Sequence, residues 1–276
     1  MTGDSSVDFQ LEDKVVIVTG SARGIGEAIA EAFGSAKCCV VIADRMARKD
    51  GFGRCEALAE RINQSGGQGL VTQVDISERT QVEKMIQATL QKFGRVDVLV
   101  SNAGMMRGGS LLETDEDNLR QQFEINVKGS FICCQLVAKQ MIKQGSGGKI
   151  VVISSVSGIE AEEGVLGYSS SKASLNVMVK CMAVELAPHK INVNAIAPGW
   201  VETEMTIPYL NKDLVKEINM RIPLGCMAKP DQIAGGALFL ASPLADYITG
   251  HVLVIDGGLL SNITIKTAQG VPKVGY

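Results

Sequence analysis

The chain has 276 residues, 46% of them hydrophobic and 21% charged, and is long enough to bury the core of one large domain. Its formal net charge of −3 argues against nucleic-acid binding, because no excess of basic residues is available to neutralise phosphates. No apolar run approaches the roughly 20 residues that span a bilayer, and the polar N-terminus does not resemble a signal peptide.

The cysteines and histidines argue against a metal centre and against disulfide bonds. The chain has seven cysteines and two histidines, but it has no C-x-x-C pair, and His189 and His251 are far apart in sequence. Most of the cysteines fall in apolar segments, which favours reduced, buried thiols. We therefore expect a cytoplasmic protein with no metal, and we do not expect a Ser-His-Asp hydrolase.

Short runs rich in Val and Ile alternate along the chain with longer amphipathic stretches. Because these runs do not alternate apolar with polar residues, they predict strands of a sheet that is covered on both faces. The order of strand and helix predicts one α/β domain over residues 1–276, with a doubly wound parallel sheet. The predicted strands are Lys14–Thr19, Cys39–Ala43, Leu70–Gln73, Val96–Val100, Lys149–Ile153, Asn192–Ile196 and Val252–Ile255; the predicted helices lie near 25–35, 54–64, 78–92, 115–143, 168–186 and 230–241.

Two segments fall outside this alternation. The stretch from Glu202 to Lys229 contains Pro208, Pro223 and a predicted short helix, and we expect residues 204–228 to cover a substrate. Residues 259–276 form a C-terminal extension that either packs across a subunit boundary or is a loose tail.

A glycine-rich turn follows the first predicted strand. It reads TGSARGIG and places glycines at 20, 24 and 26, a spacing that differs from G-x-G-x-x-G. The physical requirements are nevertheless alike, because the turn must be tight and its N–H groups must approach a pyrophosphate at a helix N-terminus. This turn predicts a dinucleotide site.

The end of the second strand bears on the choice of cofactor. Asp44 lies 18 residues after Gly26, close to the spacing of the acidic group that binds the adenosine ribose. A carboxylate there repels a 2′-phosphate, which favours NAD. Arg23 and Arg45 leave NADP open, because a guanidinium pairs readily with phosphate.

Later strand ends add to the same crevice. Asp75 follows the third strand and is expected either to accept from the adenine amino group or to cap the turn at Ser77. Residues 102–104, Asn-Ala-Gly, follow the fourth strand, where small residues leave room for a cofactor at the switch point of the sheet.

Taken in order, these motifs resemble those of the classical short-chain dehydrogenase/reductase family over roughly residues 10–260. The resemblance implies a Rossmann-type sheet of about seven strands, nicotinamide chemistry, and a homotetramer or homodimer. The matching motifs are TGSARGIG, Asp44, Asp75, NAG at 102–104, Asn126, Ser155, Tyr168-Ser169-Ser170-Ser171-Lys172, Pro198-Gly199 and Asp256-Gly257-Gly258.

The acid/base chemistry can also be argued from the residues. Tyr168 and Lys172 are four apart and share a face of a helix. A free phenol has a pKa near 10, and a cation about 4 Å away is strong enough to lower it by about 3 units. Ser155 lies at the end of the fifth strand, where its hydroxyl is placed to stabilise a substrate oxygen; Ser154 is the competing candidate.

The resemblance assigns the remaining roles. Asn126 would anchor a water that leads to the lysine, and Val201 and Thr203 would contact the nicotinamide carboxamide. The predicted catalytic residues are Asn126, Ser155, Tyr168 and Lys172. The predicted cofactor residues are Gly20, Arg23, Gly24, Ile25, Gly26, Asp44, Arg45, Asp75, Ile76, Asn102, Ala103, Gly104, Tyr168, Lys172, Pro198, Gly199, Val201 and Thr203.

The substrate remains open at this stage. We expect hydride transfer between NAD(H) and a secondary alcohol or ketone, such as a small alcohol, polyol or sugar; the alternatives are a 3-oxoacyl thioester reductase and a non-catalytic nicotinamide-binding regulatory protein. Glu160, Glu162 and Glu163 lie between Ser155 and Tyr168. They either bind polyol hydroxyls or belong to a solvated loop.

Overall fold

The computed structural model describes residues 8–46 and 50–261. These residues form a seven-stranded sheet in the order β3-β2-β1-β4-β5-β6-β7, in which every neighbouring pair is parallel. The predicted doubly wound α/β fold is therefore confirmed. The strands are β1 Val15–Thr19, β2 Cys39–Asp44, β3 Gln68–Gln73, β4 Val98–Ser101, β5 Gly148–Ile153, β6 Ile191–Pro198 and β7 Val252–Ile255.

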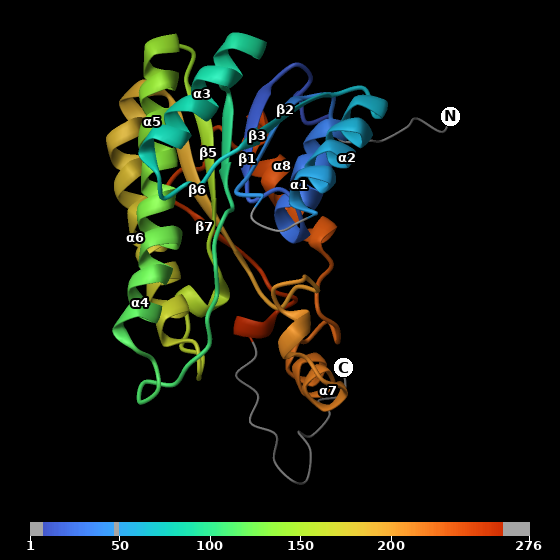
Figure 1. Cartoon of the computed structure of the whole chain (residues 1–276), viewed down its shortest axis with the longest axis vertical. Helices are drawn as coiled ribbons and strands as arrows, with labels where there is room; N and C mark the ends of the chain where they lie inside the picture. Colours follow the sequence, from blue (N-terminus) through green and yellow to red (C-terminus); the bar gives the residue numbers. More distant parts are fainter. Residues whose placement is uncertain (1–7, 47–49, 262–276) are drawn as a thin grey trace, which may run out of the picture.

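Helices cover both faces of the sheet. Figure 1 shows α1, α2 and α8 on one side, and α3, α5 and α6 on the other. The helices on the first side are α1 Gly24–Ser35, α2 Gly51–Gln64 and α8 Pro230–Ala241; those on the second side are α3 Arg79–Phe93, α5 Ser130–Gln144 and α6 Leu166–Leu186.

Successive strand residues point to opposite faces, which explains why the strands are apolar throughout. Val16 and Val18 of β1 pack in one core with Phe33 of α1. Ile17, between them, packs in the other core with Val137 of α5. Burying an aliphatic side chain of this size contributes about 1.5–3 kcal/mol, so both faces stabilise the fold.

The long helix expected over residues 115–143 is divided into three parts. It consists of α4 Glu116–Gln122, a π-helical segment Phe123–Gly129 and α5. Single π-helical turns arise where the regular hydrogen-bond pattern is interrupted, and they are frequent at functional sites. Asn126 lies inside this turn.

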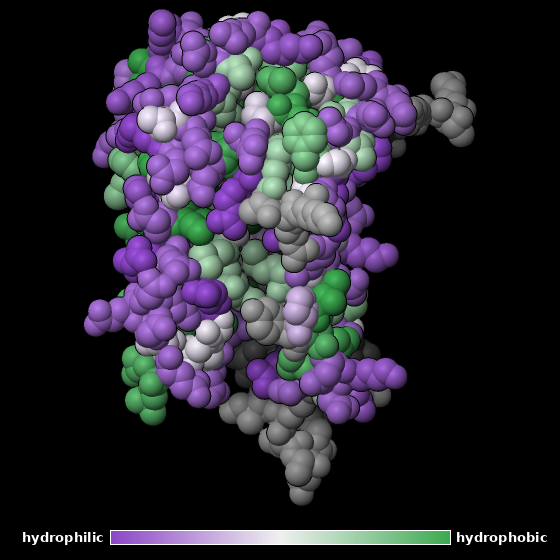
Figure 2. Space-filling view, viewed as in Figure 1, coloured by the Kyte–Doolittle hydropathy of each residue, from purple (hydrophilic) through white to green (hydrophobic). Residues whose placement is uncertain are grey.

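The segment at 204–228 contains a short helix, as expected. This helix is α7 Lys212–Arg221, preceded by a 3-10 turn at Ile207–Tyr209. Ile218 of α7 forms a small apolar cluster with Ile222 and Met227, which follow the helix, and this cluster is separate from the two main cores. Figure 2 shows hydrophobic residues gathered beside this segment, next to a hollow between the two halves of the molecule.

Two predictions remain, one on the C-terminal extension and one on membrane-spanning helices. Most of the predicted C-terminal extension, residues 262–276, lies outside the described residues. Within residues 8–46 and 50–261, no helix is long and apolar enough to cross a membrane.

The packing of α1 makes a prediction for stability. Phe33 is fully buried, so Phe33→Ala should lower the free energy of unfolding by about 3–5 kcal/mol. Phe52 of α2 is 55% exposed, and Phe52→Ala should change it by no more than about 0.5 kcal/mol. Urea denaturation of both variants measures the difference; similar losses in the two would contradict this core.

Candidate active site

The glycine turn leaves room only for glycine at its critical positions. Gly20 and Gly24 have φ of +67° and +59°, a region that residues with a Cβ rarely adopt. A Cβ on Gly26 would lie 2.2 Å from the carbonyl oxygen of Gly20. The helix α1 therefore begins in direct contact with the turn, which brings its positive N-terminus to the edge of the sheet.

Asp44 is held by backbone amides at the end of β2. One carboxylate oxygen accepts from the N–H of Ala22 at 3.1 Å and the other from the N–H of Met46 at 2.9 Å. Each oxygen keeps a further lone pair for a ligand hydroxyl. Nearby, the guanidinium of Arg45 lies 4.0 Å from the carboxylate of Asp75.

Asp75 caps the turn at Ser77, which is one of the two roles expected for it. Its carboxylate accepts from both the backbone N–H and the hydroxyl of Ser77, at 3.0 and 2.7 Å. The residue also lines the cavity described below, so turn chemistry and a ligand contact are compatible.

The end of β4 is tied to the end of β1. The amide of Asn102 donates to the carbonyl oxygens of Thr19 and Gly20 at 2.9 and 3.0 Å. The Thr19 hydroxyl in turn accepts from the backbone N–H groups of Asn102 and Ala103. These bonds fix the crevice where the order of the strands reverses, which is where open α/β sheets bind ligands.

A cavity of about 320 Å³ occupies this crevice. Among the predicted cofactor residues, Tyr168, Lys172, Pro198, Gly199 and Val201 do not line it. Those that do are Gly20, Arg23, Gly24, Ile25, Gly26, Asp44, Arg45, Asp75, Ile76, Asn102, Ala103, Gly104 and Thr203. A glycine turn at a helix N-terminus and a free acceptor at Asp44 fit the phosphates and the ribose of a dinucleotide.

The residues after β6 serve mainly as packing in the structure. A Cβ on Gly199 would lie 2.9 Å from the Cα of Asp256, and Pro198 pairs with Ile255 of β7. Val201 is buried and forms a bridge with Ala228. Of the cofactor residues predicted in this stretch, only Thr203 lines the cavity.

An ion-pair cluster across the cavity was not foreseen from the sequence. The carboxylate of Glu204 lies 2.5 Å from the guanidinium of Arg54 on α2 and 3.4 Å from that of Arg23 in the glycine turn. All three residues line the cavity. Because they are 150 or more positions apart or on different elements, no local pattern signals their contact.

Ser155 and Ser154 have different surroundings at the end of β5. The Ser154 hydroxyl donates to the backbone carbonyl of Lys172 at 3.2 Å, deep in the interior. Ser155 begins a 3-10 turn, and its hydroxyl oxygen accepts from the N–H of Ser157 at 3.1 Å. Ser154 thus attaches β5 to α6, whereas Ser155 interacts with Tyr168 and lowers the pKa of its phenol.

Tyr168 and Lys172 share one face of α6. The Nζ of Lys172 lies 5.6 Å from the centre of the Tyr168 ring. Lys172 is only 5% exposed, and its Nζ donates to the carbonyl oxygen of Ile153 at 2.7 Å. The lysine is therefore held between the end of β5 and the tyrosine ring.

Withdrawal from water dominates the acidity of both groups. It raises the pKa of Tyr168 to about 12, although the hydrogen bond with Ser155 lowers it and the charge of Glu162 raises it. Burial lowers the pKa of Lys172 to about 8. The pKa of Tyr168 is therefore raised in the structure, whereas the spacing of Tyr168 and Lys172 predicts a lowered one, because loss of hydration is the largest effect.

Asn126 connects the π-helical turn to the rest of the site. Its side-chain oxygen accepts from the N–H of Met105 at 2.8 Å, and its amide donates to the Met105 carbonyl and to the Ser171 hydroxyl, both at 2.9 Å. A Cβ on Gly104 would lie 3.1 Å from this oxygen and 3.6 Å from the Nζ of Lys172. Gly104 thus separates the cavity from the lysine by backbone alone.

The three acidic residues of the loop before α6 differ in exposure, so both expectations, a solvated loop and a carboxylate at the site, apply to part of it. Glu160 and Glu163 are exposed, as in a solvated loop. Glu162 is half-buried, and its carboxylate accepts from the hydroxyl of Ser157 at 2.5 Å. One carboxylate of the three therefore faces the site.

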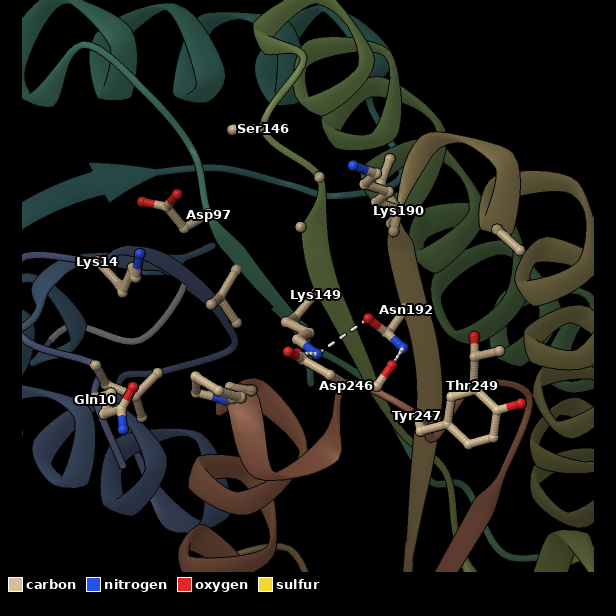
Figure 3. A pocket seen from close by; sticks show the side chains of 18 of the residues that line it. Gln10, Lys14, Asp97, Ser146, Lys149, Lys190, Asn192, Asp246, Tyr247 and Thr249 are labelled. Carbon is tan, nitrogen blue, oxygen red and sulfur yellow. Dashed lines mark hydrogen bonds and ion pairs between the residues drawn. The ribbon is translucent and has the colours of Figure 1, made fainter. Parts of the chain in front are cut away.

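A larger hollow of about 770 Å³ lies at the opposite edge of the sheet, at the amino ends of β1, β4, β5 and β6. Its central charged groups bind one another (Figure 3): the Nζ of Lys149 lies 2.6 Å from the carboxylate of Asp246 and donates to the side chain of Asn192. The carboxylate of Asp97 accepts a hydrogen bond from the backbone N–H of Val15. These contacts join strand ends, and the catalytic candidates lie at the other edge.

Comparison with known proteins agrees with this geometry. A family model described as enoyl-(acyl carrier protein) reductase matches residues 20–260. The chain is 39% identical to a 3-oxoacyl-(acyl-carrier-protein) reductase of Thermotoga maritima, over 91% of this chain and 100% of the relative. It is 35% identical to a 2-dehydro-3-deoxy-D-gluconate 5-dehydrogenase of Dickeya dadantii, over 92% and 98%.

A solved structure extends this similarity to three dimensions. It is a gluconate 5-dehydrogenase of Burkholderia cenocepacia in complex with NADP and tartrate, 32% identical, with a TM-score of 0.86 over 93% of this chain and 98% of that one. With these matches over nearly its whole described length, the chain belongs to the short-chain dehydrogenase/reductase family of NAD(P)-dependent oxidoreductases.

Proposed function

We propose that this oxidoreductase transfers hydride between NAD(H) and a secondary alcohol or ketone, with Tyr168 as the acid/base. The observation that carries the proposal is that Lys172 lies beside both the Tyr168 ring and Gly104, and that Gly104 lines the cavity. Ser155 adds to it, because it interacts with Tyr168. The same arrangement argues against a regulatory protein that only binds nicotinamide, since such a protein needs no proton donor.

Each side chain has a defined task in this proposal. The bound dinucleotide supplies the hydride acceptor or donor. Tyr168 gives a proton to the substrate oxygen during ketone reduction and removes it during alcohol oxidation. The Ser155 hydroxyl is placed to hold that oxygen, and Asn126 fixes the Met105 backbone and α6 around it.

The raised pKa of Tyr168 explains why a second positive charge matters. A group whose pKa is about 12 stays protonated at neutral pH, which suits ketone reduction. Oxidation requires the ionised phenol, so its rate should rise with pH. The positive charge of an oxidised nicotinamide would add to that of Lys172 and lower this pKa.

Two substrate classes have specific support. Glu162 near Ser155 favours a polyol or sugar-derived substrate, because a carboxylate binds hydroxyl groups, and the relative from Dickeya dadantii is named for such a substrate. A 3-oxoacyl thioester is the second candidate, since the relative from Thermotoga maritima is named for that reduction. Absorbance at 340 nm with NAD and NADP, against polyols, sugars, ketones and oxoacyl thioesters, separates them.

The surroundings of the site complete the proposal. The segment 204–228 covers the substrate, which agrees with its separate apolar cluster and with Glu204 and Met205 at the cavity.

The seven cysteines are free thiols, five of them buried, in keeping with a cytoplasmic location.

Assembly is proposed through α6. Val177 and Val184 are 61% and 77% exposed, and Cys181 between them is exposed too. Spacings of four and three residues place the three on one face of the helix, and an exposed apolar face of this kind is typical of a subunit interface. We infer a homodimer or homotetramer that buries this face.

The first prediction of the proposed function concerns Tyr168. Tyr168→Phe removes the proton donor and should lower turnover by about 10²–10⁴-fold, while the affinity for NADH measured by fluorescence changes little. Tyr247 is fully exposed at the far edge of the sheet, so Tyr247→Phe is the matched control and should keep full turnover. Wild-type turnover in Tyr168→Phe would refute the assignment.

The second prediction concerns the cofactor. Asp44→Asn keeps an oxygen acceptor for one of the two neighbouring backbone N–H groups but removes the charge that repels a 2′-phosphate. The ratio of the dissociation constants for NADH and NADPH should shift toward NADPH by about 10-fold or more. Asp231→Asn, which removes a charge from the first turn of α8, should leave the ratio unchanged. If Asp44→Asn left it unchanged as well, Asp44 would not select NAD.

The third prediction concerns assembly. A double variant with Val177→Asp and Val184→Asp puts two charges on the proposed interface and should shift the protein toward monomer in sedimentation velocity. Leu112 is 94% exposed elsewhere on the surface, so Leu112→Asp should not alter the assembly. A monomeric wild type, or a double variant with unchanged mass, would rule out this interface.

A further inference from the structure

Three arginine side chains belong to the lining of the dinucleotide cavity, and each of them lies against a carboxylate. The carboxylate of Glu204 lies 2.5 Å from the guanidinium of Arg54 and 3.4 Å from that of Arg23. The carboxylate of Asp75 lies 4.0 Å from the guanidinium of Arg45. All five residues line the cavity, so its positive groups are compensated within the protein.

Arg23 and Arg54 lie at the end of the cavity where Asp44 is held. The backbone N–H groups of Ala22 and Met46 donate to the Asp44 carboxylate. Arg23 directly follows Ala22 in the glycine turn. Arg54 lies in the first turn of α2, and this helix begins in close contact with the backbone of Met46. Both guanidiniums are therefore carried by the segments that hold the carboxylate expected to bind the adenosine ribose.

The charges of the cavity are unfavourable for an additional phosphate at this end. NADP carries a 2′-phosphate on the adenosine ribose, and a phosphate of this kind has a charge of about −1.5 to −2 at neutral pH. It is bound best by guanidiniums that have no carboxylate partner. The described residues that line the cavity include three basic ones, Arg23, Arg45 and Arg54, and four acidic ones, Asp44, Asp50, Asp75 and Glu204.

Glu204 is held in place by the turn at the start of the segment 204–228. The hydroxyl oxygen of Thr206 accepts from the backbone N–H of Thr203 at 3.1 Å. A Cβ on Gly24 would lie 3.4 Å from the side chain of Thr203, so this turn rests against the glycine turn. Glu204 therefore reaches the two guanidiniums from a fixed backbone position.

Glu204 is ionised at neutral pH and compensates both arginines. The hydrogen bond from Arg54, together with the charges of Arg54 and Arg23, holds the pKa of the Glu204 carboxyl below its usual value. Arg54 also pairs with Asp50 at 2.7 Å. Within residues 8–46 and 50–261, Arg23 forms an ion pair with Glu204 and with no other carboxylate. Neutralising Glu204 would thus leave Arg23 without a counter-charge and Arg54 with one of its two.

We propose that Glu204 is a cofactor-specificity residue, which pairs with Arg23 and Arg54, withholds both guanidiniums from the 2′-phosphate of NADP, and so favours NAD. This inference rests on the proposed use of NAD(H) and adds a second selecting carboxylate to Asp44. The two carboxylates act differently, because Asp44 repels the phosphate directly, whereas Glu204 engages the cations that would bind it. NAD carries a hydroxyl at the same position and does not need these guanidiniums.

The test compares the dissociation constants for NADH and NADPH, measured by nicotinamide fluorescence at constant ionic strength. Glu204→Gln keeps the size of the side chain and removes its charge, and it should shift the ratio toward NADPH by about 3- to 10-fold. Glu202→Gln is the matched control, because Glu202 is exposed two positions away and is not part of the cavity lining. It should leave the ratio unchanged. An unchanged ratio in Glu204→Gln would overturn the proposal.

A variant without the two arginines separates withheld guanidiniums from simple charge repulsion. In a protein that carries Arg23→Gln and Arg54→Gln, adding Glu204→Gln releases no guanidinium, so the ratio should shift by no more than about 2-fold. Direct repulsion of the phosphate by Glu204 would give the same shift with or without the arginines. An undiminished shift in this background would therefore overturn the proposal.

Ligands that lack nicotinamide locate the effect at the adenosine ribose. Adenosine 2′,5′-bisphosphate and adenosine 5′-monophosphate differ only in the 2′-phosphate, and isothermal titration calorimetry measures both with the full chain. Glu204→Gln should shift their ratio toward the bisphosphate by a similar factor. A shift that appears with the intact cofactors and is absent with these fragments would place the contact elsewhere and overturn the proposal.

Failure of the proposed function gives a different result. If the wild type bound NADPH more tightly than NADH, the proposed use of NAD(H) would fail, whereas the shift caused by Glu204→Gln would still decide whether Glu204 opposes the 2′-phosphate. If the wild type turned over no alcohol or ketone, the proposed reaction would fail, and the binding ratios would still test the role of Glu204.

Discussion

The account depends on two ionisable side chains that are withdrawn from water on one turn of α6. Tyr168 and Lys172 each become harder to charge there, so the pKa of the phenol rises while that of the ammonium falls. At neutral pH the phenol therefore stays protonated, whereas the ammonium, with a pKa of about 8, keeps most of its positive charge. In the proposed mechanism, a further positive charge beside Gly104 lowers the pKa of the phenol, which couples the acid/base chemistry to the cofactor.

The fold holds this pair at the cofactor cavity through backbone contacts. Asn102 joins the ends of β4 and β1, and Asn126 joins the π-helical turn to α6. At Gly104, where the two regions meet, a side chain would approach Asn126 and Lys172. In the proposed mechanism, the missing side chain at Gly104 leaves room for the dinucleotide next to the lysine.

Local patterns in the sequence predicted the parts of the site that lie within one element or at one strand end. The glycine turn, Asp44 after β2 and the spacing of Tyr168 and Lys172 are of this kind. The contact of Glu204 with Arg54 depends on tertiary packing, which residue spacing does not reveal. The π-helical turn at Asn126 could not be predicted, because its residues also fit a regular helix. The raised pKa of Tyr168 follows from burial of the phenol, which residue spacing does not show.

The most direct test of the central claim is the ionisation of difluorotyrosine at position 168, measured by ¹⁹F NMR with and without saturating NAD⁺. The account predicts that the oxidised cofactor lowers the midpoint by about one pH unit. It also predicts that Lys172→Met raises the midpoint with and without the cofactor, because a cation beside the phenol is removed. A midpoint that neither the cofactor nor the lysine changes would show that the phenol does not sense the charges on which this mechanism depends.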